Sequence, residues 1–196
     1  MIVWEVNSKN FGAIAKKAAL ALQKGKIVAC PTDTVYGLVA DATDERAVRK
    51  VFLIKGRKKM KPLPIFVSSI AMAKKLAKVG SVQEKFLHKV WPGKVTLVLE
   101  SRGLLAKETG THASIGLRIP KHKLVQLLLQ KVKTPLTGTS ANLSGEPPLR
   151  ESKEIFHQFQ NRKHAPDVLI DAGKLLFSRP SMVIDITKEK PVVLRK

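Results

Sequence analysis

The chain has 196 residues, 44% of them hydrophobic, which is enough for a sizeable core and disfavours wholesale disorder. Its 36 Lys and Arg against 15 Asp and Glu give a net charge of +21, which favours an anionic partner such as nucleotide, RNA or phosphate unless it is a general solubility or thermostability bias. A single cysteine excludes an internal disulfide, which suits a reducing compartment. The sequence has no apolar run of about 18 residues and no basic N-terminal region of a signal peptide, so we expect a cytoplasmic protein with no membrane partner.

Strand and helix signals follow one another along the whole chain. The first predicted elements are a strand at 2–6, a helix capped by Asn7 or Ser8 and ended by Gly25, a strand at 26–30, a helix at 44–55, a strand at 63–68, a helix at 69–80 and strands at 94–101 and 114–119. A helix at 122–131, a strand at 134–140, a helix at 152–159 and strands at 167–173, 181–187 and 191–195 complete the series. Early alternation and late clustering of strands predict an α/β fold with a large mixed sheet flanked by helices.

Two predicted elements direct charge to defined places. The helix at 44–55 begins with acids and ends with bases, which complements a helix dipole and places the basic cluster "KGRKKMK" at its C-terminal end. In the strand at 114–119, apolar residues alternate with Gly116 and Arg118, so we expect Arg118 on the face opposite the apolar side chains.

Polar stretches border three predicted strands, and ligands of α/β sheets bind at such strand ends. They are "PTDTVYG" at 31–37, "KGRKKMK" at 55–61 and "TSANLSGEPP" at 139–148. Each has an ordinary alternative, since Ser, Asn and Gly form turns, Thr32 and Thr34 can cap a turn, and a basic cluster can be plain surface. The basic cluster can equally bind RNA or a polyphosphate, and neither a GxxxxGK[ST] loop nor GxGxxG is present to decide.

Six segments considered together resemble the YrdC family. They are "PTDTVYGL", "KGR" followed by Pro and an apolar strand, "WPGKVTLVL", "GLRIP", "TSANLSG" and "SMVIDIT" with "VVLR", in that order over residues 6–195. The best-characterised members of this family are threonylcarbamoyl-AMP synthases. The resemblance implies a twisted open mixed α/β sheet with a positively charged cavity, in one domain over 1–196 that lacks the C-terminal domain of the longer members.

The resemblance also implies a reaction and its partners. L-threonine, bicarbonate and ATP are the expected substrates, and threonylcarbamoyl-AMP and pyrophosphate are the products. The adenylate would serve threonylcarbamoyladenosine (t6A) modification at position 37 of tRNA, together with other t6A-modification proteins. Mg²⁺ is expected to arrive with ATP and to be held chiefly by its phosphates, so no protein metal ligand is assigned.

Site residues are carried over position by position. Lys55 and Arg57 match the phosphate-binding pair and are the expected catalytic groups, since charge builds on the phosphate oxygens during transfer. The other expected ATP contacts are Lys61, Ser114, Ser140, Asn142 and Arg195. The expected threonine contacts are Thr34, Arg118 and Ser181, and the planar donor fork of Arg118 suits a carboxylate. Asp33 and Asp185 are expected only as supporting groups.

Three positions depart from the family pattern. Lys61 stands where many members have Asn, and Phe66 stands where many have His. The segment "PSMVID" replaces "ESTVVD". The first two changes touch expected ATP and threonine contacts, so they bear on how the substrates are bound and on which acceptor is used.

Two other functions fit the residues. A double-stranded RNA or tRNA-binding module without synthase activity needs only basic side chains, although 5% aromatic residues and no RNP-like pair disfavour base stacking. A carbamoyl-transfer domain like those of hydrogenase maturation factors is the other, but those factors carry acylphosphatase and zinc-finger segments that this sequence lacks. The five histidines show no metal spacing and are expected at the surface or in helices.

Overall fold

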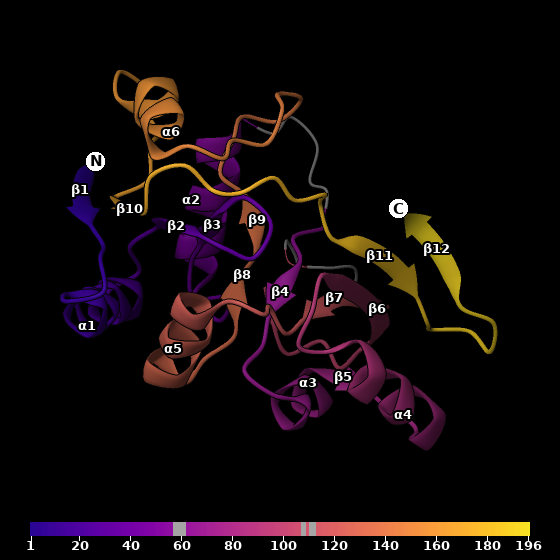
Figure 1. Cartoon of the computed structure of the whole chain (residues 1–196). Coiled ribbons are helices and arrows are strands. Elements are labelled where there is room, and N and C mark those ends of the chain that lie inside the picture. The colour runs from indigo at the N-terminus through magenta and orange to yellow at the C-terminus, as the bar shows by residue number, and fades with distance from the viewer. Residues whose placement is uncertain (57–61, 107–108, 110–112) are drawn as a thin grey trace.

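The structure is a computed structural model that describes residues 1–56, 62–106, 109 and 113–196. Within these ranges the strands form two mixed sheets that lie side by side (Figure 1). The first sheet has the order β1 (Ile2–Glu5), β10 (Val168–Asp171), β2 (Val28–Pro31), β3 (Tyr36–Val39) and β9 (Thr139–Ser140). The second has the order β12 (Val192–Arg195), β11 (Met182–Asp185), β6 (Val95–Ser101), β7 (Ser114–Arg118), β4 (Ile65–Phe66) and β8 (Leu136–Thr137), with β5 (Ala77–Lys78) pairing with β6.

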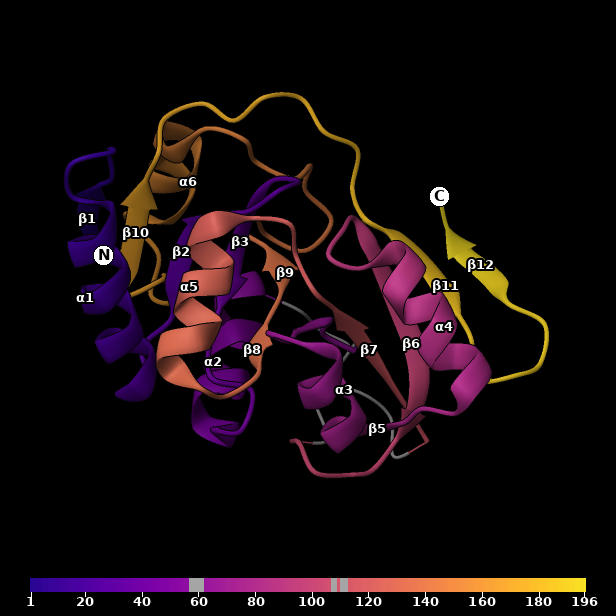
Figure 2. The same ribbon diagram turned by 60° about the horizontal axis from the view of Figure 1, so that its bottom comes forward.

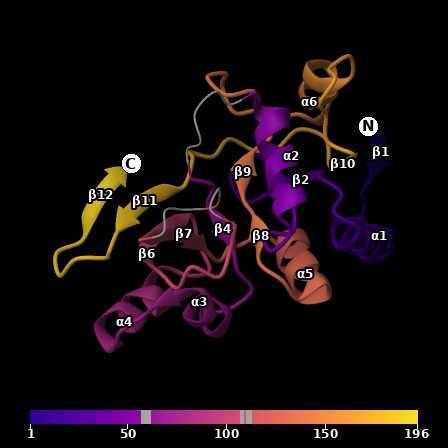
Figure 3. The same cartoon turned by 180° about the vertical axis from the view of Figure 1, so that it is seen from behind.

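Helices cover both faces of the first sheet. On one face pack α1 (Phe11–Gln23) and α5 (Lys123–Val132), and on the other α2 (Glu45–Lys55) and α6 (Ser152–Phe159) (Figures 2 and 3). In β2, Val28 and Cys30 join the core beneath α1, whereas Ala29 joins the core beneath α2, because successive side chains of a strand point to opposite faces. A strand buried on both faces has a continuous apolar run, which explains why this strand is readable from the sequence.

Among the described residues, the second sheet carries helices on one face only. There α3 (Ile70–Leu76) and α4 (Ser81–Val90) pack against an apolar set that includes Leu97 of β6 and Leu117 of β7. The neighbouring residues Thr96, Gly116 and Arg118 point to the opposite face and line a cavity. The strand alternation therefore directs a polar set of side chains into a hollow that the helices leave open.

Segment 136–140 passes from one sheet to the other. β8 pairs with β4, whereas β9, which follows Gly138, pairs with β3. A Cβ atom on Gly138 would lie 2.3 Å from Cε1 of Phe66, so the chain can pass this close to the ring only with glycine there. The α/β class with mixed sheets flanked by helices is confirmed, but the prediction of one large sheet with one strand at 134–140 is wrong.

Local differences from the predicted elements have simple causes. α2 begins after Asp44, whose side chain accepts hydrogen bonds from two backbone N–H groups, as its acidic start predicts. The cap predicted for α1 is wrong, because the N-cap is Asn10, and Asn7 forms a hydrogen-bonded turn just before it. Neither β3 nor α4 has a counterpart among the predicted elements. Of the helices in the described ranges, none has the length and apolar character needed to cross a bilayer.

Candidate functional site

A cavity of about 540 Å³ is lined by residues of both sheets. Its walls come from the 32–37 segment and β9 of the first sheet, from β6, β7 and β11 of the second, and from the segment leading into β11. The predicted substrate contacts in this lining are Thr34, Ser114, Arg118, Ser140, Ser181 and Arg195, and the lining also includes Asp185, which was expected as a supporting group. Positions far apart in the sequence therefore converge on one space, as a substrate site requires.

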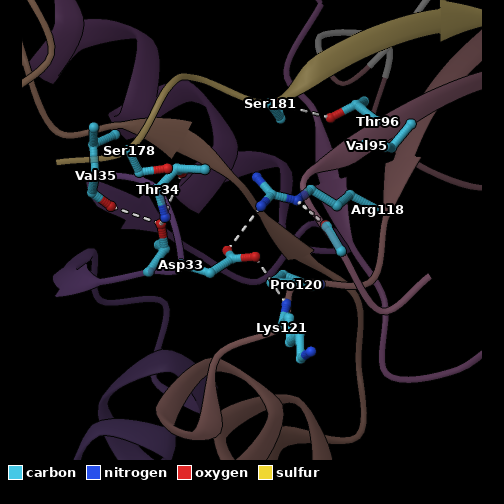
Figure 4. A network of polar contacts seen from close by, with 12 residues as sticks. Asp33, Thr34, Val35, Val95, Thr96, Arg118, Pro120, Lys121, Ser178 and Ser181 are labelled. Atoms are coloured by element: carbon cyan, nitrogen blue, oxygen red, sulfur yellow. Dashed lines mark hydrogen bonds and ion pairs between the residues drawn. The ribbon is translucent and has the colours of Figure 1, made fainter. Parts of the chain in front are cut away.

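Arg118 is held at the cavity wall by two partners. Its Nη2 donates to Oδ1 of Asp33 at 2.8 Å, and its Nε donates to the Gly93 carbonyl at 2.9 Å (Figure 4). The Asp33 carboxylate also accepts the backbone N–H of Lys121 at 3.0 Å. Both charged side chains are almost fully buried, at 4% and 7% exposure. Burial lowers the pKa of Arg118, which the Asp33 charge opposes, so the guanidinium stays charged and suits a carboxylate ligand.

Ser181 is linked to both neighbouring strands of its sheet. Its Oγ lies 3.2 Å from Oγ1 of Thr96 in β6. From β12, Arg195 donates to the Ser181 carbonyl through Nε at 3.1 Å and Nη2 at 2.8 Å, and through Nη2 to Ser181 Oγ at 3.1 Å. Arg195 lines the cavity as expected of a nucleotide contact, and its fork also fixes the backbone and hydroxyl of Ser181.

Thr34 faces the cavity from the turn between β2 and β3. Thr32 closes this turn, because its Oγ1 donates to the Val35 carbonyl at 2.6 Å and accepts the Thr34 backbone N–H at 3.1 Å. The two threonine hydroxyls lie 3.1 Å apart. The turn-capping interpretation therefore holds for Thr32, while the nearly buried Thr34 hydroxyl is fixed within the lining.

Lys55 supports the loop that carries two predicted ATP contacts. The side chain is 2% exposed, and its Nζ donates to the carbonyls of Ser140 at 2.7 Å and Asn142 at 2.8 Å and lies 3.3 Å from Asn142 Oδ1. Lys55 and Asn142 stand behind the lining rather than in it. A direct phosphate contact by Lys55 stays a prediction, and the contacts add a structural role.

Replacing Lys55 with Met tests this structural role. The change removes the ammonium from two buried carbonyls, so we expect the free energy of unfolding to fall by about 2–5 kcal/mol in urea denaturation. Lys50→Met on the same helix is the control, since Lys50 is exposed and makes one 3.5 Å contact. A Lys55→Met protein as stable as the control would leave only the phosphate role.

Two predicted residues, Arg57 and Lys61, lie outside the described residues. Phe66 is in the lining, 3% exposed, with the Arg118 guanidinium carbon 5.8 Å from its ring centre. The polar lining residue Thr96 was missed, although the alternation of 94–101 places it opposite the apolar Leu97. Thr139 was also missed, and no sequence signal singles it out.

His122 lies where the predicted helix at 122–131 begins, but it is not exposed at the surface. It stands at the start of α5 partly buried, and its Nδ1 is a buried ring nitrogen without a hydrogen-bond partner among the described residues. Burial lowers the pKa of His122 from its ordinary value, partly opposed by the charge of Asp33. The neutral imidazole is therefore the form that the folded state favours.

The lowered pKa of His122 predicts acid sensitivity. Its stabilising contribution is full above the unfolded-state pKa of about 6.5 and is lost as the pH falls from there through the folded-state pKa. We therefore expect the stability advantage of the wild type over His122→Gln to shrink between about pH 7.5 and about pH 5, measured by urea unfolding. The same change at exposed His88 controls for loss of an imidazole, and equal pH dependence of both variants would contradict the assignment.

Known proteins resemble this chain in both sequence and fold. The sequence model of the Sua5/YciO/YrdC protein family matches residues 20–196. The description of that family model is "Telomere recombination". The chain belongs to the Sua5/YciO/YrdC family. This membership and the fold confirm the resemblance inferred from the six sequence segments.

Individual members of the Sua5/YciO/YrdC family show how far the similarity reaches. A threonylcarbamoyl-AMP synthase of Pyrococcus abyssi is 36% identical over 180 residues, which are 91% of this chain and 52% of that protein. A putative threonylcarbamoyl-AMP synthase of Methanocaldococcus jannaschii is 34% identical over an alignment of 198 positions, which covers 99% of this chain and 90% of that protein. The crystal structure of P. abyssi Sua5 complexed with L-threonine has a TM-score of 0.91 at 32% identity and covers 100% of this chain and 57% of that one. This chain thus spans about half the length of the Pyrococcus relative.

Proposed function

We propose that this family member is an L-threonylcarbamoyl-AMP synthase, which makes threonylcarbamoyl-AMP, pyrophosphate and water from L-threonine, bicarbonate and ATP. The observation that carries the proposal is the convergence of six predicted substrate contacts on one cavity. Relatives at about one-third identity are named threonylcarbamoyl-AMP synthases, and the similar Sua5 structure holds L-threonine, which supports the choice of substrate. The product would serve t6A modification of tRNA.

Threonine would bind beside Arg118, the cation that is held in a fixed position at the cavity wall. The Arg118 fork receives the carboxylate, and the hydroxyls of Thr34 and Ser181 read the β-hydroxyl of the substrate. Both protein hydroxyls are already held by neighbouring groups, so they need little reorganisation when threonine arrives. The threonine amine then condenses with carbon dioxide derived from bicarbonate to give a carbamate.

ATP would bind beside Ser114, the 140–142 loop and Arg195. A carbamate oxygen attacks the α-phosphorus, the bond to the bridging β-phosphate oxygen breaks, and pyrophosphate leaves. Arg57 is the principal cation that balances the charge that grows on the phosphate oxygens. Mg²⁺ is proposed to enter with ATP; in the part of the chain that the structure describes, no group of three or more His, Cys, Asp and Glu could hold a metal.

The deciding measurement is pyrophosphate release by the purified protein. Release that needs threonine, bicarbonate and ATP together, with threonylcarbamoyl-AMP identified by mass spectrometry, is the expected result. ATP hydrolysis without threonine, or no release at all with folded protein, would contradict the proposal.

A folded Arg57→Ala protein should lose most of this activity. Its assigned role is to stabilise the transition state by about 2–4 kcal/mol, and this role requires no packing in the core. We expect a matching fall in kcat/KM for ATP and an unchanged free energy of unfolding. Lys58→Ala is the control, because Lys58 has no assigned substrate contact. Equal losses of activity in the two variants would contradict the role assigned to Arg57.

The RNA-binding alternative retains one argument, the net charge of +21. It predicts salt-dependent binding of duplex RNA or tRNA by a protein that releases no pyrophosphate. The same preparation can be tested for both properties, so the alternative gains support only where the pyrophosphate assay fails.

A further inference from the structure

The carboxylate of Asp33 lies behind the cavity rather than in it. Asp33 is absent from the lining, although its neighbours Thr32 and Thr34 are part of it. Its two oxygens have separate partners, Arg118 for Oδ1 and the backbone N–H of Lys121 for Oδ2. The backbone N–H of Lys121 therefore holds the Asp33 carboxylate in place independently of the contact with Arg118.

The Arg118 guanidinium is anchored at two points. Of its five N–H groups, one on Nε is used by Gly93 and one on Nη2 by Asp33 among the described residues. The anchors come from different segments, the link between α4 and β6 and the turn between β2 and β3. Two anchors fix the plane of a rigid fork, and in Figure 4 the remaining nitrogen of Arg118 points away from Asp33.

We propose that Asp33 is a positioning residue that locks the orientation of the Arg118 guanidinium and thereby gives the cavity an oriented, stereoselective seat for an amino acid carboxylate. The inference rests on the proposed function for the presence of an amino acid. Asp33 also balances the charge of Arg118, so a carboxylate gains little from net attraction and much from correct geometry. Without Asp33 the cation attracts carboxylates at least as strongly, but the fork can turn and orientation is lost.

Asp167 provides a matched control. It too pairs with a basic side chain and a backbone N–H, Lys26 at 3.0 Å and Ile27 at 2.8 Å, but neither it nor these partners are lining residues. Replacing either aspartate with Asn removes one structural ion pair. Only Asp33→Asn is expected to change the selectivity of the cavity between L- and D-threonine.

The test compares thermal stabilisation by L-threonine, D-threonine and L-threonine methyl ester. The wild type should prefer the L-acid over both others. The ratio of L- to D-threonine affinity should fall about tenfold or more in Asp33→Asn and stay within about twofold in Asp167→Asn. In turnover assays, kcat for L-threonine should fall about tenfold while KM changes less than about threefold.

Each outcome separates this proposal from the synthase proposal. Stabilisation needs no turnover, so L-threonine binding without pyrophosphate release would overturn the synthase and leave the seat standing. Equal stabilisation of the wild type by threonine and its methyl ester would overturn the seat. If Asp33→Asn does not fold, Asp33→Glu, whose carboxylate is displaced by one methylene, should show the same loss of selectivity. Unchanged selectivity in the folded variant, or an equal loss in Asp167→Asn, would overturn the role of Asp33.

Discussion

Arg118→Leu is expected to lower the free energy of unfolding by about 3–5 kcal/mol, because it leaves the Asp33 charge buried without its partner. It should also lower threonine-dependent pyrophosphate release about 100-fold, since the substrate carboxylate loses a charged, two-donor contact. Urea denaturation and kcat/KM for threonine measure the two effects separately. Lys26→Leu breaks the exposed pair with Asp167 and should cost no more than about 1 kcal/mol.

A double variant separates the two effects of Arg118. Arg118→Leu with Asp33→Asn removes both charges, so much of the lost stability should return, because an uncharged pair carries no uncompensated buried charge. Turnover should stay low, because no fork is present for the carboxylate. If the double variant regains turnover together with stability, Arg118 serves the fold alone and its threonine role must be withdrawn.

Strand alternation made part of this fold and site predictable from the sequence. The apolar run of β2 and the alternation of β7 place Cys30 in a core and Arg118 on the opposite face, as observed. Such local patterns carry the information because a strand has a period of two. The family resemblance supplied the other predicted lining residues, but not Thr96 or Thr139.

Long-range pairing explains what the sequence did not predict. The division into two sheets depends on Gly138 passing the Phe66 ring, a contact between positions 72 residues apart. The two contacts that hold Arg118 likewise join it to residues distant in the sequence, 85 residues away at Asp33 and 25 residues away at Gly93. Charge and turn chemistry identified such residues as polar, but only the folded chain determines which polar groups meet. Lys55 shows the same limit, since the family resemblance implied phosphate binding, and its hydrogen bonds to the carbonyls of Ser140 and Asn142 are visible only in the folded chain.

Substrate choice should follow the β-hydroxyl more than the methyl group of threonine. The hydroxyls of Thr34 and Ser181 are held by Thr32, Thr96 and Arg195, so they present fixed hydrogen-bonding groups to the cavity. A hydroxyl has one donor and two acceptor sites, so each of these groups keeps hydrogen-bonding capacity that only a ligand hydroxyl fills. Leaving that capacity unfilled in a buried site costs more than the loss of one methyl contact. Serine is therefore expected to be a poor substrate, about 10–100-fold below threonine, and 2-aminobutyrate a worse one.

The measurement is pyrophosphate release with threonine, serine, 2-aminobutyrate and valine at equal concentration. Valine places a methyl group where the hydroxyl belongs, so it should also fall below serine. Phe66 makes the wall beside Arg118 apolar, which excludes water and strengthens the remaining polar contacts. In Ser181→Ala the preference for threonine over 2-aminobutyrate should shrink about tenfold, whereas Ser101→Ala, outside the lining, should retain it. Should 2-aminobutyrate outperform serine with the wild type, the cavity reads shape rather than the hydroxyl, and Thr34 and Ser181 lose their assigned roles.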